Sequence, residues 1–138
     1  MADKISIILS DGSVDKLMVA ATLASGAAVM EKEVLLFLTM GGLLAFRKGD
    51  WRRNSAISPD LSPVADAMRQ GLKGDDKGAL WLTTLQSAKE VGSLDIVACS
   101  QTMDMFGIKK DDLEPLVDSV GGVATYYSKA EEGQTIFI

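Results

Sequence analysis

Three short, almost wholly apolar runs, separated by stretches with helical spacing, constrain the fold of this 138-residue chain most strongly. They are residues 4–10 (KISIILS), 34–39 (VLLFLT) and 94–98 (LDIVA). Strands that are apolar along their whole length are typical of a parallel sheet covered on both faces. Between the first two runs, apolar residues recur at helical spacing over residues 14–30, with Ser13 as the N-cap. Strand, helix and strand together predict a βαβ unit.

The middle of the chain continues this alternation. The dipeptide Ser62-Pro63, a serine N-cap followed by proline, predicts the start of another helix. The spacing over residues 79–91 predicts a further helix, which leads into the third apolar run. Residues 101–106 then form a short helix that Gly107 ends.

The C-terminal segment allows two interpretations. Residues 123–127 and 135–138 could pair as a hairpin. Alternatively, residues 116–120 form a strand, residues 122–132 a helix and residues 134–138 a last strand. We favour the second, because it keeps the alternation and its connection is long enough for a right-handed parallel crossover. The predicted fold class is therefore α/β.

The composition excludes several classes of function. A net charge of −5 argues against nucleic-acid binding, which needs a basic face. Because the chain has no histidine, it lacks the imidazole of Ser-His-Asp and Cys-His catalysis and of most mixed zinc sites. No apolar run reaches the ~18 residues of a membrane span, and residues 1–4 run into the first strand without a signal-peptide pattern. We therefore expect a cytoplasmic protein of one domain, 1–138, with no membrane or nucleic-acid partner, and predict neither a cofactor nor a metal site.

The chain has a single cysteine, Cys99, which lies where the strand over residues 94–98 stops and a helix begins. This is the position at which α/β sheets present their chemistry. The first N–H groups of a helix have no partner within it and stabilise a thiolate held against them. A free cysteine is also commonly a small, buried and inert side chain. On position alone, the reactive and the inert interpretation both stay open.

Two long segments carry a resemblance to a known family. They are residues 11–48, DGSVDKLMVAATLASGAAVMEKEVLLFLTMGGLLAFRK, and residues 95–138, DIVACSQTMDMFGIKKDDLEPLVDSVGGVATYYSKAEEGQTIFI. The most specific parts are residues 98–107 followed by 121–125, and then 37–43 (FLTMGGL). These segments resemble the small DsrE/DsrF-like proteins, especially the DsrE2-type branch often labelled peroxiredoxin-like.

The resemblance implies a three-layer α/β/α domain with a mainly parallel five-stranded sheet, flavodoxin-like in outline and commonly assembled into trimers or hexamers. It also implies cytoplasmic sulfur relay. In members that carry it, the cysteine matching Cys99 accepts sulfane sulfur as a persulfide or thiosulfonate and passes it to another carrier. The implied partners are sulfur-carrier proteins or small sulfur anions. Whether such a protein is a carrier or a sulfurtransferase-like catalyst stays open.

Sulfur relay requires an accessible thiol, no second cysteine that would collapse the persulfide into a disulfide, and N–H donors for the anionic sulfur. We expect Cys99 to meet the first two requirements, as an accessible thiol and as the single cysteine of the chain. The predicted donors are backbone amides after the Cys99 strand and at the end of the strand over residues 34–39: Ser100, Gln101, Thr102, Gly41 and Gly42. For the glycine pair, turn formation is the common alternative.

Two other functions stand beside sulfur relay. One is a one-cysteine peroxidase or redox sensor, in which a partner thiol resolves a sulfenic acid on Cys99; the chain lacks the Thr-x-x-Cys setting of true peroxiredoxins. The other is a non-catalytic oligomeric binding module with a buried cysteine. A basic cluster around Trp51, formed by Arg47, Lys48, Arg52 and Arg53, could dock an acidic carrier or guide a thiosulfate-like anion, or be a solvated loop.

Overall fold

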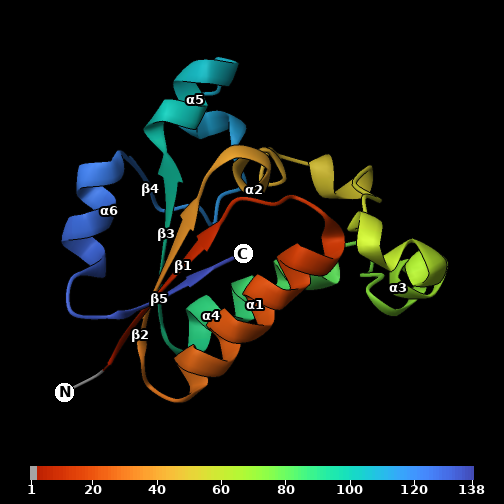
Figure 1. The fold of residues 1–138 in the computed structure, drawn as a ribbon, viewed down its shortest axis with the longest axis horizontal. Coiled ribbons are helices and arrows are strands. Elements are labelled where there is room, and N and C mark those ends of the chain that lie inside the picture. The colour runs from red at the N-terminus through yellow and green to blue at the C-terminus, as the bar shows by residue number, and fades with distance from the viewer. Residues whose placement is uncertain (1–2) are drawn as a thin grey trace.

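The computed structural model describes residues 3–138, and a five-stranded sheet runs through its centre. Its strands are β1 (Lys4–Leu9), β2 (Glu33–Leu38), β3 (Ser93–Cys99), β4 (Ser119–Gly121) and β5 (Gln134–Phe137). The strand order is β4-β3-β2-β1-β5, and all neighbouring strands are parallel (Figure 1). Because β5 pairs in parallel with β1, the hairpin interpretation of the C-terminal segment is wrong and the crossover is confirmed.

Helices cover both faces of this sheet, which confirms the predicted α/β class and its layers (Figure 1). Helices α1 (Val14–Val29) and α4 (Leu80–Val91) pack against each other on one face. Helix α6 (Val123–Ala130) lies on the opposite face. The inner side of α1 is rich in buried alanines, and these small side chains let the helix approach the sheet closely.

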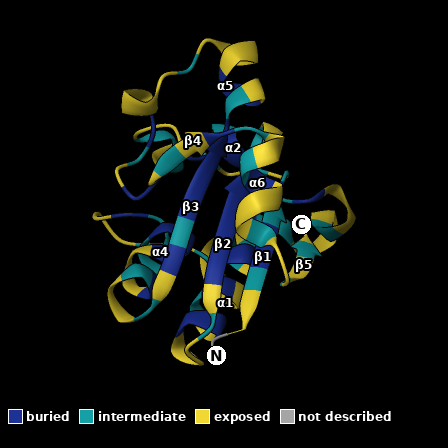
Figure 2. Cartoon of the chain, turned by 90° about the vertical axis from the view of Figure 1, so that its left-hand side faces the viewer, coloured by how far each residue is buried: buried dark blue, intermediate teal, exposed yellow. Residues whose placement is uncertain are grey.

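The hydrophobic core lies along the central strands. All residues of β2 from Val34 to Leu38 are buried, as is most of β3, whereas β5 at the edge is largely exposed (Figure 2). Each buried leucine or isoleucine side chain stabilises the fold by about 1.5–3 kcal/mol. The continuous apolar runs of the sequence thus correspond to strands buried on both faces.

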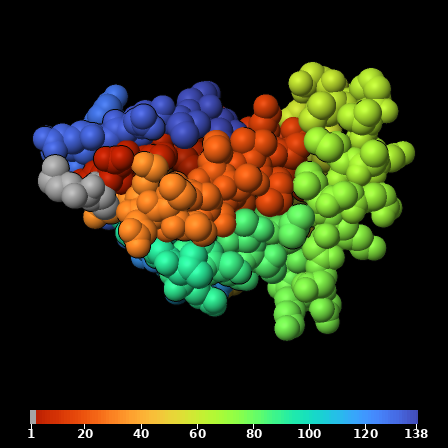
Figure 3. Space-filling view, turned by 90° about the horizontal axis from the view of Figure 1, so that it is seen from below, coloured from red at the N-terminus to blue at the C-terminus, as the bar shows by residue number. Residues whose placement is uncertain are grey.

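The segment between β2 and α4 is the least regular part of the chain. It contains α2 (Met40–Leu44), the 3₁₀ turns η1 (Asp50–Arg52) and η2 (Pro59–Val64), and α3 (Ala65–Gly71). Figure 3 shows the yellow-green part of this segment standing at one end of the molecule.

The helix predicted to start at Ser62-Pro63 begins differently. Both residues lie inside η2, and regular α-helix starts only at Ala65. The Ser62 hydroxyl donates to the Pro59 carbonyl at 2.7 Å rather than capping the following turn. The short 3₁₀ turn accommodates Pro63.

Two features follow β3. Helix α5 (Ser100–Phe106) ends at Gly107, whose φ of 62° is the left-handed conformation that glycine adopts without steric cost. A 3₁₀ turn, η3 (Lys110–Asp112), follows. It is joined to the segment after α2, because the Lys48 N–H donates to the Asp112 carbonyl at 2.9 Å. Within residues 3–138, no helix combines the length and the hydropathy needed to cross a membrane.

Candidate functional site

Cys99 is the last residue of β3 and the N-cap of α5, at the carboxyl edge of the sheet. It pairs with Gly121 of β4 on one side. On the other side, Leu38 of β2 pairs with Ala98, so that Thr39 follows beside Cys99. Figure 1 shows α5 and α2 continuing from β3 and β2 at this same edge. The thiol therefore lies where parallel α/β sheets hold their ligands and reactive groups.

The thiol is covered by the surrounding chain. Cys99 is 4% exposed, Met103 one turn further along α5 is also buried, and Thr102 has no exposed surface. The expectation of an accessible thiol is therefore wrong for this structure, and burial agrees with the inert interpretation of the cysteine. The groups around the sulfur are polar, however, and this distinguishes the site from an ordinary apolar core position.

Two threonine hydroxyls meet beside the sulfur. Thr102 Oγ1 accepts the backbone N–H of Met40 at 3.1 Å and lies 3.2 Å from Thr39 Oγ1. A hydroxyl has one hydrogen to donate and two lone pairs that accept. The Thr102 hydroxyl hydrogen is therefore left for Thr39 or for the sulfur of Cys99.

The surroundings lower the pKa of the Cys99 thiol. Burial is the largest single influence and raises the pKa, because it disfavours the charged thiolate. Hydrogen bonds act in the opposite direction: those from the Thr102 N–H and hydroxyl are the largest, followed by the Thr39 hydroxyl and the Gln101 N–H. Together they outweigh burial, so the pKa lies below its ordinary value. The arrangement favours the nucleophilic form of the sulfur.

Of the predicted donors in α5, the amides of Gln101 and Thr102 are the two that lower the pKa of the thiol. Ser100 is the first residue of α5, and its side chain faces Gly122, where an added Cβ would lie 3.4 Å from the serine Oγ. Sequence reasoning missed Thr39. The sequence places Thr39 directly after the second apolar run, but Thr39 lies next to Cys99 only because β2 pairs with β3.

Gly41 and Gly42 lie in α2, on the far side of Thr39 from Cys99. The Gly42 N–H donates to the Ser10 carbonyl at 3.1 Å, and an added Cβ on Gly42 would lie 2.2 Å from the Leu9 carbonyl oxygen. Both glycines therefore allow the start of α2 to pack against the end of β1. Their part in binding an anion at Cys99 stays a prediction.

Met40, between Thr39 and these glycines, has a φ of +46°. This left-handed conformation is uncommon for residues other than glycine. It turns the chain from β2 into α2 while the Met40 N–H points to Thr102 Oγ1. Strained residues of this kind concentrate at functional sites.

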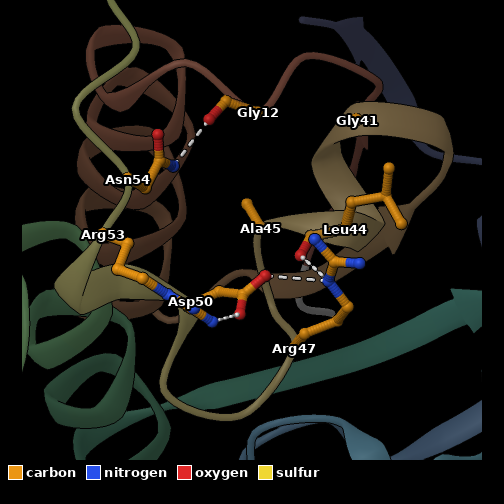
Figure 4. A pocket seen from close by; sticks show the side chains of 8 residues that line it. All are labelled: Gly12, Gly41, Leu44, Ala45, Arg47, Asp50, Arg53 and Asn54. Atoms are coloured by element: carbon orange, nitrogen blue, oxygen red, sulfur yellow. Dashed lines mark hydrogen bonds and ion pairs between the residues drawn. The ribbon is translucent and has the colours of Figure 1, made fainter.

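The three arginines of the basic cluster make different contacts. Arg47 Nε and Arg53 Nη2 donate to the two carboxylate oxygens of Asp50, at 2.8 and 3.3 Å. Arg52 instead stacks over Trp51, with its guanidinium carbon 4.4 Å from the ring centroid. Arg47 and Arg53 line a cavity that Gly41 also borders (Figure 4).

Comparison with known proteins agrees with this fold and sequence pattern. The model of the DsrE/DsrF/DrsH-like family matches residues 1–73 and 59–138. The uncharacterized protein YrkE of Bacillus subtilis (strain 168) is 32% identical over an alignment that covers 93% of this chain and 91% of YrkE.

Two solved structures share the fold. MTH1491 of Methanobacterium thermoautotrophicum, a protein of unknown function, superposes with a TM-score of 0.60 at 14% identity over 99% of each chain. The YchN protein of E. coli superposes with a TM-score of 0.57 at 13% identity over the whole of both chains. Because the family model matches the chain along its whole length and YrkE is 32% identical to it, this chain belongs to the DsrE/DsrF/DrsH-like family.

Proposed function

We propose that this protein is a sulfur-relay protein that carries sulfane sulfur on Cys99, as a persulfide or as a thiosulfonate. The observation that carries the proposal is a thiol at the carboxyl edge of the sheet whose hydrogen-bond donors outweigh its burial and lower its pKa. Membership of a family linked to sulfur relay supports it. Two threonine hydroxyls and two backbone amides lower the pKa of this thiol, and an apolar packing position would not supply them.

Loading and unloading need no external oxidant. The Cys99 thiolate attacks the outer sulfur of a donor persulfide, the donor S–S bond breaks, and the donor leaves as a thiolate. An acceptor thiolate then attacks the outer sulfur on Cys99 and releases the Cys99 thiolate. With tetrathionate, attack at a central sulfur releases thiosulfate and leaves a thiosulfonate on Cys99. The N–H groups of Gln101 and Thr102 stabilise the anionic sulfur in each case.

Access to the sulfur requires local opening, since Cys99 is 4% exposed. Helix α5 is the element to open: it has only seven residues, and Met105 and Phe106 at its end are exposed. Short elements with few buried contacts open at a lower free-energy cost than the core. Opening at this exposed end of α5 would uncover Cys99 while Gln101 and Thr102, at the start of the helix, stay beside the sulfur.

The proposal extends to assembly, partners and location. The partners are small sulfur anions or sulfur-carrier proteins, and the assembly is a homo-oligomer, a trimer or hexamer. Exposed apolar side chains such as Phe106, Tyr127 and Phe137 provide surface that association would bury. A lone free thiol suits the reducing cytoplasm.

Intact-mass measurement tests loading. Wild type and Cys99→Ser are incubated with polysulfide, tetrathionate or peroxide, and each sample is measured again after thiol reduction. We expect a reducible sulfur adduct on wild type alone. Oxygen adducts without sulfur adducts would favour the peroxidase or sensor, and an unmodified folded wild type would favour the binding module with a buried cysteine.

A further inference from the structure

A cavity of about 680 Å³ lies at the carboxyl edge of the sheet, between the loop after β1 and the segment that follows α2 (Figure 4). Gly12, in the loop after β1, and Gly41, at the start of α2, both border this cavity. The groups that lower the pKa of Cys99 do not border this cavity.

The backbone borders the cavity directly at its two glycines. An added Cβ on Gly12 would lie 2.4 Å from the Gly41 carbonyl oxygen, so a side chain at this position cannot be accommodated without displacing backbone. Asn54 Nδ2 donates to the Gly12 carbonyl at 2.9 Å and holds the loop after β1 against the segment that carries the arginines. Backbone at Gly12 and Gly41 therefore forms one side of the cavity.

The opposite wall carries an excess of positive charge. Arg47 and Arg53 share one carboxylate, Asp50, which is about one-fifth exposed. Arg47 also donates from Nε to the Leu44 carbonyl at 3.2 Å. Within residues 3–138, the hydrogen bonds of these arginines involve Arg47 Nε and Arg53 Nη2, although each guanidinium has five N–H groups to donate. The remaining N–H groups, and one unneutralised positive charge, are available to a ligand.

The size and chemistry of the cavity define the ligand class. Guanidinium groups match the geometry of phosphate and carboxylate oxygens. The volume lies within the roughly 300–1,000 Å³ of small-molecule sites, well above the need of an inorganic anion. Leu44 and Ala45 add apolar lining for a carbon skeleton. We propose that this cavity binds a small organic anion, whose phosphate or carboxylate group is held by Arg47 and Arg53.

NMR titration of the isotope-labelled full chain tests the proposal, with phenyl phosphate, benzoate and inorganic phosphate as probes. We expect saturable shifts of the Gly12 and Gly41 amides with at least one organic anion. Tighter binding of phenyl phosphate than of benzoate identifies a phosphate ligand, and the reverse identifies a carboxylate. Inorganic phosphate binding as tightly as both organic probes would overturn the proposal, as would the absence of saturable shifts at these glycines.

Charge variants make the test specific. Arg47→Gln and Arg53→Gln should each weaken binding by about tenfold, because each removes hydrogen bonds to a charged group. The matched control is Arg52→Gln, which loses the same charge from a residue that stacks on Trp51 outside this cavity. Asp50→Asn should tighten binding, because it removes the competing carboxylate. Equal weakening of binding in all three arginine variants would show that only the net charge matters, and would overturn the proposed site. None of these titrations uses the thiol. A failure to bind the anions would therefore leave the proposed role of Cys99 unaffected.

Discussion

Thr102 Oγ1 accepts the backbone N–H of Met40 at 3.1 Å, and this contact joins the helix after Cys99 to the end of the neighbouring strand. The same hydroxyl lowers the pKa of the thiol. One buried side chain therefore holds the turn from β2 into α2 and lowers the pKa of the thiol at the end of β3.

Removing the Thr102 hydroxyl should raise the pKa of the Cys99 thiol. Thr102→Val keeps the shape of the side chain but loses its hydrogen bond to the sulfur, so less thiolate is present at neutral pH. The rate of alkylation by iodoacetamide is measured against pH, and the midpoint of this pH profile should move to higher pH. The exposed Thr22→Val is the matched control. An unchanged pH profile in Thr102→Val would show that the hydroxyl does not act on the thiol.

Thr102→Val should also lower stability, because the Met40 N–H is left without its acceptor. Losing this partly buried hydrogen bond costs about 0.5–1.5 kcal/mol in the free energy of unfolding. Urea denaturation measures the loss, and Thr102→Ser, which keeps the hydroxyl, should retain more of this free energy. Equal losses in the valine and serine variants would assign the effect to packing alone.

Asp15 should make stability depend on pH in the acid range. Burial raises the pKa of this carboxyl, but hydrogen bonds from the Ser58 hydroxyl at 2.6 Å and N–H at 2.9 Å outweigh it and lower the pKa. A lowered folded-state pKa stabilises the fold fully above the unfolded value of about 4, and this contribution is lost as pH falls through the folded-state pKa.

The measurement is urea denaturation of wild type and Asp15→Asn at neutral and acid pH. Asp15→Asn should be less stable by about 1–3 kcal/mol at neutral pH, with the difference shrinking below about pH 4. The exposed Asp60→Asn serves as control. A difference that stays constant, or grows, on acidification would contradict the account.

The conformation of Met40 predicts a stabilising substitution. At a φ of +46°, Met40→Gly removes the clash of Cβ with the backbone, whereas Met40→Ala keeps it. Met40→Gly should be the more stable of the two variants by about 1 kcal/mol, measured by denaturation. Greater stability of the alanine variant would show that this turn carries no steric strain.

Gly42 should not tolerate a side chain. Its added Cβ would lie 2.2 Å from the Leu9 carbonyl oxygen, so Gly42→Ala forces backbone to move and costs about 1–3 kcal/mol. Gly26 in α1 has nothing within 4 Å of the same position, and Gly26→Ala should leave stability unchanged or raise it by about 0.4–1 kcal/mol. Thermal denaturation of Gly42→Ala and Gly26→Ala measures both changes in stability. Similar changes in the two variants would contradict the close approach of α2 to β1.

Much of the fold follows from the sequence because its strands are buried on both faces. The continuous apolar runs and the helical spacing between them predict β1, α1, β2, α4 and β3 to within one or two residues. Gly107 likewise marks the end of α5 through its left-handed conformation. The start at Ser62-Pro63 is missed because the Ser62 hydroxyl bonds to Pro59 within a 3₁₀ turn, a local competition that a capping pattern does not reveal.

The site was predictable only in part. The position of Cys99 and the amides of Gln101 and Thr102 follow from a strand that runs directly into a helix. Thr39 lies 60 residues away from Cys99 in the chain and becomes its neighbour only through the pairing of β2 with β3. The burial of the thiol is likewise a property of packing that no local pattern contains.

Discharge of a loaded Cys99 tests sulfur relay most directly. Wild type loaded with polysulfide is freed of donor and mixed with a small acceptor thiol, and both partners are measured by mass after alkylation. We expect the protein to return to its unmodified mass while the acceptor gains one sulfur atom, with no transfer from Cys99→Ser treated alike. Sulfur that stays on the protein, or equal transfer in the two samples, would rule out sulfur relay through Cys99.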